Sequence, residues 1–462
     1  MTDVSLGGWL ENHGTELGLV RVGNQVNPAD YQATALLARL ETGEGAPPVL
    51  FERVSSLQGS PSPFKMLFNA YASRRSLMRA LGYDGESWRD LLEQLSQLTA
   101  DLKPHRLVER GEVQTHVFVG PEVDLRDLPW TRHVEGEGGP YFTPIVVSRE
   151  PGSARYNLSW NRVMFFDRRH VGVHISPRQL WAFQRVAEEQ GDDLPVALVL
   201  GHHPGFNLAA ASLTAMTVDE YEVAGALMGH GIEVVPSISF GSDLLVPAHA
   251  EAVIEGRLLA GRRAVEGPFG EYMRYLGPQK LSHVLEVDAV TYRDQPTILE
   301  VFAGHQDHLH AHLSIHASLL AAAKSAVPQV VDLGWFKGGG PTTAVISVKK
   351  SAAGQPMRAA LAVMASGNLI KQVIVVDEDI DVFDAQQVMW AVSTRVRADQ
   401  DVNIFKGLQG SLLDPSHPGF GTTSGMVIDA TWSLDGPRAP IARVPDDALA
   451  RYPLEGYQME KD

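Results

Sequence analysis

The pattern of apolar and polar residues changes character along this chain of 462 residues. Near the start, residues 47–57 form the short apolar run expected of a strand. Residues 64–100 then repeat apolar side chains every three or four positions, which predicts helices. The pattern therefore predicts a mixed α/β segment over residues 1–115.

From residue 116 to residue 315 the pattern is one of short apolar runs separated by Gly and Pro. Helical spacing appears only at 177–190 and 218–229, and no GxGxxG motif follows a strand, which argues against a Rossmann site. Many short strands with few helices favour a barrel or sandwich, here a split-barrel-like domain. The predicted strands lie at 115–120, 143–150, 155–166, 170–176, 195–201, 232–241, 283–293 and 296–304.

The remaining residues, 316–462, alternate strand-like and helix-like runs. This β-α-β order predicts a small layered α/β domain at the C-terminus. The fold class predicted for the whole chain is therefore α/β (α+β), with three parts in this order.

Composition limits the classes of function. Hydrophobic residues make up 44% and charged residues 20%, which is typical of a soluble globular enzyme. The formal charge of −16 argues against nucleic acid as a main partner. The absence of cysteine excludes disulfides and thiolate chemistry, and it is consistent with a reducing cytoplasm. Neither a signal peptide nor a membrane span is apparent, so we expect a cytoplasmic protein.

The stretch EGPFGEYMRYLG, residues 266–277, places Glu266 and Glu271 on either side of a turn-forming sequence. On a straight helix the two would point about 140° apart, and on a strand they would face opposite sides. Pro268 and Gly270 instead favour a tight bend, which can bring both carboxylates to one cavity. Paired acids in such a cavity are suited to acid/base chemistry. For the pair taken alone, a polar loop with two solvated acids is the simpler alternative.

Several motifs occur together in a fixed order. They are N-x-x-x-x-R at 157–162, EYEVAGAL at 220–227, EGPFGEY at 266–272, and the supporting segments 49–54, 304–313 and 374–395. This ordered set resembles the UbiD-like family of prenylated-FMN-dependent decarboxylases. The motifs cover most of the chain, so the resemblance is specific.

The resemblance implies a catalytic network of Arg162, Glu266 and Glu271. Glu271 would be the proton donor that replaces CO₂ on the substrate carbon, while Arg162 would hold the substrate carboxylate and pair with Glu266. An acid with this role must keep its proton until CO₂ leaves, which burial and a second nearby carboxylate favour. Arginine suits the task because it binds carboxylates with two parallel hydrogen bonds.

The resemblance also implies a cation at the flavin phosphate, Mn²⁺ or Mg²⁺, with K⁺ close by. Asn157 and Glu220 match the amide and carboxylate ligands, and both residues would thereby help to bind the cofactor. Oxygen ligands of this kind suit a hard cation. Glu222, two residues further along the same predicted helix, is the alternative match to the carboxylate ligand.

At the third metal ligand the sequence departs from the family. The family has a histidine where this chain has Arg178 or Gln179. Three alternatives remain open: His174 substitutes from another position, the metal has two protein ligands completed by phosphate and water, or Arg178 pairs directly with the phosphate.

Lys371 lies where a family lysine reaches the flavin phosphate, although a surface lysine before a buried strand is an equal alternative. The resemblance further implies a C-terminal oligomerisation domain, a homodimer or higher homo-oligomer, and a separate flavin prenyltransferase that supplies the cofactor. The expected reaction is non-oxidative, reversible decarboxylation of an α,β-unsaturated, aromatic or heteroaromatic acid. Indole-, pyrrole- or furan-type acids are favoured, because a histidine-rich segment at 305–316 can bond a ring N–H or hydroxyl.

Three other functions compete with this one. A non-catalytic assembly protein would use the C-terminal α/β domain only for self-association. An FMN-dependent oxidoreductase on a split barrel would share the central domain, but it needs no acid pair. A zinc hydrolase would use a histidine cluster, although the H-E-x-x-H pattern is absent. That cluster comprises His305, His308, His310, His312 and His316.

Overall fold

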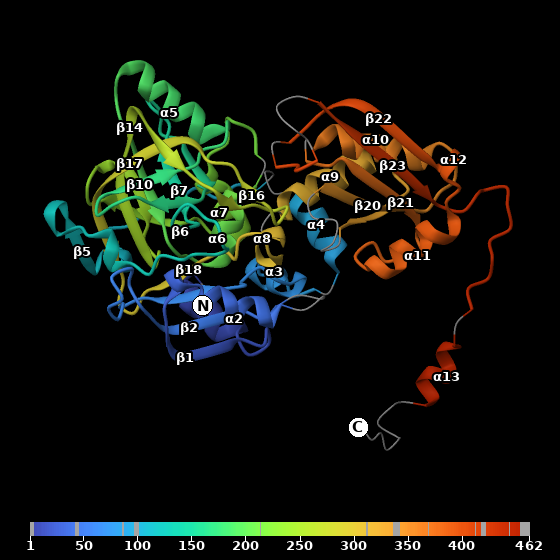
Figure 1. Ribbon diagram of the computed structural model, residues 1–462, viewed down its shortest axis with the longest axis horizontal. Coiled ribbons are helices and arrows are strands. Elements are labelled where there is room, and N and C mark those ends of the chain that lie inside the picture. The colour runs from blue at the N-terminus through green and yellow to red at the C-terminus, as the bar shows by residue number, and fades with distance from the viewer. Residues whose placement is uncertain are drawn as a thin grey trace.

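The computed structural model has three parts: a smaller N-terminal part lies beneath the central domain, and the C-terminal domain lies beside these two (Figure 1). The structure describes residues 4–41, 46–85, 87–96, 101–212, 214–310, 313–335, 342–367, 369–411, 413–416, 422–442 and 444–452. Within these residues, no helix is long and apolar enough to cross a membrane.

The N-terminal part is a mixed sheet with the strand order β1-β2-β3-β18, flanked by helices. The strand β18 comes from much later in the chain and pairs in parallel with β3, Thr297 lying opposite Lys65. The elements are α1 (Leu6–His13), β1 (Val20–Val26), α2 (Gln32–Leu40), β2 (Val49–Val54), β3 (Lys65–Phe68), α3 (Arg74–Ala80), α4 (Trp88–Ser96) and β18 (Thr297–Leu299).

The helical prediction for 64–100 is wrong at its start. Residues 65–68 form the strand β3, and helices begin only at Arg74. Met66, Leu67 and Phe68 are all buried. A short apolar run buried on both faces looks the same in a strand and in a helix, so spacing alone could not separate them.

The central domain is built on a sheet that curls into a half-barrel (Figure 1). In the described chain its order is β6-β9-β10-β17-β14-β11-β7-β8, with β5 added beside β17. This confirms the predicted split-barrel-like class. The strands are β5 (His116–Val119), β6 (Tyr141–Phe142), β7 (Ile145–Arg149), β8 (Tyr156–Trp160), β9 (Val163–Phe165), β10 (His170–Val173), β11 (Leu194–Val199), β14 (Ala252–Glu266) and β17 (Lys280–Tyr292).

The longest pairing in this sheet joins β14 and β17 as antiparallel neighbours. Their register places Glu266 opposite Lys280, and Ala264 opposite Ser282. Because side chains alternate faces along a strand, Lys280 and Ser282 lie on the same face as Glu266. The strand β14 ends at Glu266, and the bend of residues 266–277 begins there.

Helices and two small sheets complete the central domain. Asp219 caps α7 by accepting a hydrogen bond from the Tyr221 N–H, and Gly229 ends that helix in a left-handed conformation. The remaining elements are β4 (Arg106–Leu107), α5 (Gln179–Gln190), α6 (Pro204–Ala210), α7 (Glu220–Met228), β12 (Glu233–Ser237), β13 (Gly241–Pro247), β15 (Phe269–Gly270) and β16 (Leu276–Gly277).

The C-terminal domain has the predicted β-α-β order and a sheet arranged β19-β20-β21-β23-β22. The strands β20, β21 and β23 run parallel, and antiparallel strands lie at both edges. The elements are α8 (Gln306–His310), α9 (Leu313–Ala326), β19 (Val330–Gly334), β20 (Thr343–Val348), α10 (Gln355–Ser366), β21 (Gln372–Asp377), α11 (Ala385–Arg395), α12 (Ala398–Asp401), β22 (Val402–Gln409), β23 (Thr422–Ala430) and α13 (Asp446–Arg451).

Shared apolar cores join the three parts. Phe51 and Met66 of the N-terminal sheet belong to the same core as Leu285 of the central sheet. Trp9 and Tyr71 belong to a second core that includes Ile346 of the C-terminal sheet and residues of α4 and α9. The N-terminal part thus packs against both of the other domains. The division at 115 and 315 stays a prediction.

Candidate active site

Arg162 lies in the break between β8 and β9 and forms a two-pronged contact with Glu266. Its Nε donates to Glu266 Oε1 at 2.9 Å, and its Nη2 donates to Glu266 Oε2 at 3.1 Å. Glu266 is fully buried and Arg162 is 7% exposed. A fork of this kind fixes both side chains, because two parallel hydrogen bonds leave little rotational freedom.

The bend at 266–271 brings the second carboxylate to the same guanidinium. The Nη1 of Arg162 donates to Glu271 Oε1, so one arginine bridges both acids. Burial opposes the positive charge, but Glu271 and Glu266 outweigh it and raise the pKa of Arg162. The antiparallel pairing of β15 with β16, in which Phe269 lies opposite Gly277, closes the bend. The structure therefore places Arg162, Glu266 and Glu271 together.

Three further side chains support this network, and sequence reasoning missed all of them. Tyr141 Oη lies 3.1 Å from Glu266 Oε1, and Ser282 Oγ donates to Glu266 Oε2 at 3.2 Å. Burial, followed by Glu266, raises the pKa of Tyr141, so the phenol keeps its proton and donates. The Phe269 ring lies 5.0 Å from the Arg162 guanidinium carbon. Glu266 is therefore held as a fully bonded carboxylate.

A second cation, Lys280, lies beside this network and was also missed. Its Nζ donates to His174 Nε2 at 3.1 Å. Burial and then Arg162 lower the pKa of His174 to about 3, so the ring is neutral and accepts this bond. Burial and Arg162 also lower the pKa of Lys280. Recognising that Lys280 lies opposite Glu266 requires the strand register, which one sequence does not supply.

Gly277 lies directly against the Glu271 side chain. A Cβ added at Gly277 would lie 2.7 Å from Glu271 Oε1, too close for the present position of that carboxylate. We expect Gly277→Ala to displace Glu271 and to lower kcat about 10- to 100-fold, since a shift of about 1 Å can cost that much. Steady-state turnover of cofactor-loaded protein measures this effect.

Gly354→Ala is the matched control for that substitution. Gly354 has no heavy atom within 4 Å of an added Cβ, so the same change in composition should leave turnover unaltered. Unchanged kcat in Gly277→Ala would show that the position of Glu271 does not matter to the reaction.

Asn157 and Glu220 also lie together, as the family motif implies. Glu220 Oε2 accepts hydrogen bonds from Asn157 Nδ2 and from the Leu158 N–H, both at 2.6 Å, while Thr214 donates to Oε1 at 3.2 Å. Burial raises the pKa of Glu220 to about 7. Asn157 Oδ1 is buried without a hydrogen-bond partner among the described residues. An orphan oxygen beside a buried carboxylate is the donor set that a hard cation satisfies.

The sequence left three alternatives open for the third ligand beside Asn157 and Glu220. Among the described residues, no group of three or more His, Asp and Glu side chains could hold a metal ion. Gln179 is buried at the first turn of α5, and Arg178 precedes it as an exposed residue. His174 is engaged by Lys280, which occupies the lone pair that a metal would need. Glu222 is only partly buried.

Lys371 lies in the C-terminal domain, just before β21. Its Nζ donates to Asp414 at 2.7 and 2.8 Å and to Ser416 Oγ at 2.8 Å. These contacts do not join it to the Arg162 network. Its predicted contact with the flavin phosphate stays a prediction.

The histidine cluster is divided among different partners. His305 Nδ1 pairs with Glu41, and His308 Nδ1 accepts a hydrogen bond from the Gly304 N–H at 3.1 Å. The His308 ring stacks on Tyr272 with centroids 3.8 Å apart. His316 lies against Trp335. The side chains of His310 and His312 lie outside the described residues.

Fold and site together define a class of enzyme, the carboxy-lyases, and family models specify it further. The models of the N-terminal, Rift-related and C-terminal domains of 3-octaprenyl-4-hydroxybenzoate carboxy-lyase match residues 9–95, 106–306 and 308–430. The chain belongs to the UbiD family of decarboxylases, as its motifs predicted.

Individual relatives agree with this assignment. The chain is 31% identical to the anhydromevalonate phosphate decarboxylase of Aeropyrum pernix, over 94% of each chain. It is 30% identical to the phenolic acid decarboxylase of Streptomyces sp. strain D7, over 89% of each. The UbiD-class enzyme HmfF from Pelotomaculum thermopropionicum in complex with FMN is 35% identical with a TM-score of 0.89, covering 98% of this chain and 100% of that one. An evolved dimeric form of HmfF in complex with prFMN has a TM-score of 0.87, 33% identity and the same coverage.

Proposed function

We propose that this protein catalyses non-oxidative, reversible decarboxylation of an unsaturated or aromatic carboxylic acid with prenylated FMN as cofactor. One observation carries the proposal: a buried arginine bridges two glutamates at the bend of residues 266–271. Hydride transfer by an FMN oxidoreductase, the competing function, has no use for such a bridged acid pair.

In this reaction Arg162 binds the substrate carboxylate and Glu271 delivers the proton. The bond between the substrate carbon and the carboxyl carbon breaks, CO₂ leaves, and a proton from Glu271 takes its place on that carbon. Glu266, held by Arg162, Tyr141 and Ser282, keeps the guanidinium in one orientation. In the reverse direction Glu271 accepts the proton, as microscopic reversibility requires.

The cofactor supplies the remaining chemistry. When bound, prenylated FMN provides the electron sink that makes loss of CO₂ feasible. Asn157 Oδ1 and the Glu220 carboxylate would hold a Mn²⁺ or Mg²⁺ at its phosphate, with K⁺ close by and Arg178 and Lys371 as further candidate contacts. The buried, unbonded Asn157 Oδ1 fits this role. A separate flavin prenyltransferase would supply the cofactor in the cytoplasm, and the C-terminal domain would mediate assembly into a homodimer or larger homo-oligomer.

The absence of a histidine at the third ligand position has a measurable consequence. We expect chelation to weaken cofactor retention less than in relatives that have all three ligands, because the metal contributes less here. Gln179→His, which restores that ligand at a buried position, should increase the metal content. Metal analysis and flavin absorbance after dialysis against a chelator measure both effects.

Gln190→His, at the other end of α5, is the matched control and should leave the metal content unchanged. One Mn²⁺ per unaltered chain, resistant to chelation, would contradict the prediction.

For the substrate, we propose a heteroaromatic acid of indole, pyrrole or furan type. The stacked pair of Tyr272 and His308 supports this choice. His308 Nδ1 accepts the Gly304 N–H, which fixes the orientation of the ring against Tyr272. Tyr272 directly follows Glu271 in the sequence, so this aromatic surface starts at the acid.

A panel of such acids tests the proposed function. The protein is produced together with a flavin prenyltransferase, the bound cofactor is weighed by mass spectrometry, and CO₂ release is measured for each acid. We expect prenylated FMN and turnover of at least one heteroaromatic acid. Plain FMN with hydride-transfer activity would favour the oxidoreductase. Loaded protein that releases CO₂ from none of the heteroaromatic, cinnamate-like or phenolic acids would contradict the proposal.

A further inference from the structure

Three ionisable side chains are buried together behind the bend that carries Glu271. His133 Nδ1 lies 3.7 Å from Glu137 Oε1, and its Nε2 lies 3.6 Å from Glu300 Oε1. The exposed fractions of the His133, Glu137 and Glu300 side chains are 0%, 0% and 1%. Burial acts against a charged ring, but Glu137 and Glu300 outweigh it and raise the pKa of His133 to about 9. The His133 ring thus lies between two buried carboxyl groups at ion-pair rather than hydrogen-bond distance.

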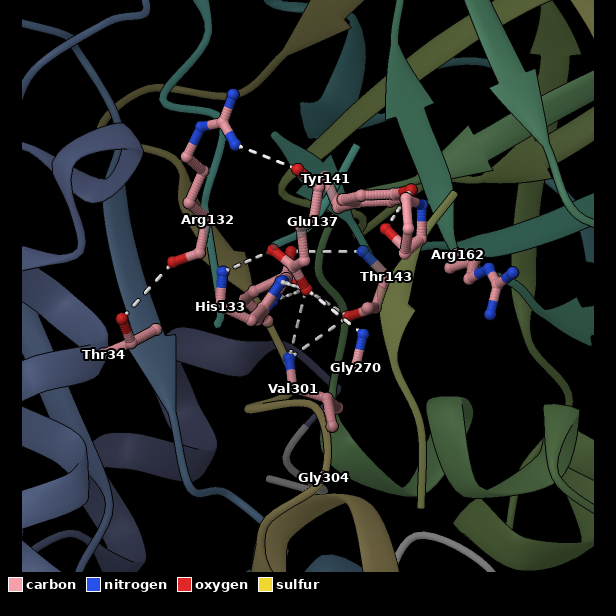
Figure 2. Close-up of polar contacts among 12 residues, drawn as sticks. Thr34, Arg132, His133, Glu137, Tyr141, Thr143, Arg162, Gly270, Val301 and Gly304 are labelled. Atoms are coloured by element: carbon pink, nitrogen blue, oxygen red, sulfur yellow. Dashed lines mark hydrogen bonds and ion pairs between the residues drawn. The ribbon is translucent and has the colours of Figure 1, made fainter. Parts of the chain in front are cut away.

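One end of this cluster contacts the bend. Glu137 Oε2 accepts the His133 N–H at 2.8 Å, and Glu137 Oε1 accepts the Gly270 N–H at 3.4 Å. Gly270 is the residue before Glu271. The His133 ring also meets the Phe269 ring edge-on, with centroids 5.6 Å apart. Both residues between Pro268 and Glu271 are therefore in contact with the cluster, as Figure 2 shows for Gly270.

The other end ties the cluster to the segment that leads into α8. Glu300 accepts hydrogen bonds from the Thr143 hydroxyl, from the Thr143 N–H at 3.2 Å and from the Val301 N–H at 3.3 Å. That segment then returns to the bend. At Gly304, which has a φ of +75°, an added Cβ would lie 3.1 Å from the Glu271 carbonyl oxygen. Gly304 thus lies close against the backbone of Glu271, while Glu137 bonds the preceding residue Gly270.

We propose that His133 is a positioning residue, which holds Glu137 and Glu300 together and so fixes the place of Glu271 relative to Arg162. The inference rests on the proposed role of Glu271 as proton donor. If His133 lost its charge, two carboxylates would be buried side by side without a counter-ion, and one of them would have to move or take up a proton. Glu137 is the one bonded to the bend, so the displacement would reach Glu271.

The test replaces His133 by Gln in cofactor-loaded protein. We expect kcat to fall at least about 10-fold while KM changes less than about 3-fold, since Arg162 still binds the substrate carboxylate. Glu137→Gln should do the same. His249→Gln is the matched control, because His249 pairs with Glu233 at 3.1 Å in the same domain but away from the bend. It should keep the kcat of the unaltered protein.

A pH profile separates positioning from a merely structural role. The raised pKa of His133 means that the charged ring stabilises the folded protein. This contribution to stability is fully present below about pH 6.5 and is lost as the pH rises through about 9. The groups that face the ring are Glu137 and Glu300, and Asp307 lies close enough to Glu300 to interact with it. We expect kcat of the unaltered protein to decline through about pH 9 while the fold persists, and His133→Gln to lack this step.

Two results would overturn the inference. One is a His133→Gln protein that is less stable but has the kcat of the unaltered protein; the other is an unaltered protein whose kcat stays constant to pH 10 with its fold intact. The second measurement applies even if the variant does not fold. Failure of the proposed function would look different, because then Glu271→Gln would remain active, whatever the behaviour of His133→Gln.

Discussion

Replacing Glu271 by Gln should abolish turnover while the protein keeps its flavin. Glutamine has nearly the same shape and still accepts a hydrogen bond from Arg162 Nη1, so the network around the guanidinium should persist. It cannot deliver a proton. General acids contribute about 10²–10⁴-fold, and we expect kcat to fall within or beyond that range. Steady-state CO₂ release and the flavin absorbance spectrum, recorded on the same preparation, measure both parts of the result.

Glu286→Gln is the matched control, because Glu286 lies on β17 and pairs with Arg257 away from the bend. It should have unaltered turnover. Full activity in Glu271→Gln would remove Glu271 from its assigned role. Loss of the flavin would instead show that Glu271 helps to bind the cofactor.

Replacing Arg162 by Lys should impair the reaction by a different route. Lysine keeps the positive charge but loses the fork that contacts both oxygens of Glu266. Loss of a charge-assisted hydrogen bond costs about 1.5–3 kcal/mol, which corresponds to a fall in kcat/KM of roughly 10- to over 100-fold. If Arg162 also assists maturation of the prenylated flavin, the absorbance spectrum should change as well.

Arg257→Lys is the matched control for that variant. Arg257 forms the same kind of fork, with Asp288 at 3.0 and 3.1 Å, and its position is half-buried and outside the network. A small effect at Arg257 beside a large one at Arg162 would show that the loss comes from the site. An Arg162→Lys protein with near-normal turnover and a normal absorbance spectrum would show that Arg162 has no role in the reaction.

The predictable part of the molecule was local in sequence. The bend at Glu266–Glu271 could be inferred because Pro268 and Gly270 favour a tight turn over those few residues. Alternating apolar runs likewise predicted the central sheet and the β-α-β order of the C-terminal domain. In each case the determining residues lie within about a dozen positions of one another.

The unpredictable part depends on contacts between distant segments. His133 and Glu300 meet only because β6, β7 and the segment after β18 come together, and nothing near either residue marks it as special. Tyr141 reaches Glu266 across a similar distance in sequence. Without the register of the sheet, such residues read as ordinary polar positions of a loop or a strand. The sequence therefore pointed to Glu266 and Glu271 but not to the side chains that hold them in place.

The place of β18 in the N-terminal sheet has a consequence for biosynthesis. Lys65 of β3 emerges from the ribosome about 230 residues before its partner Thr297. At translation rates of about 5–20 residues per second, the interval is roughly 10–50 s. Throughout it, a nascent chain that has already paired β1, β2 and β3 carries an open strand edge at Lys65, Met66 and Leu67. Open strand edges recruit other chains, so this aggregation-prone edge persists in the nascent chain until Thr297 has been made.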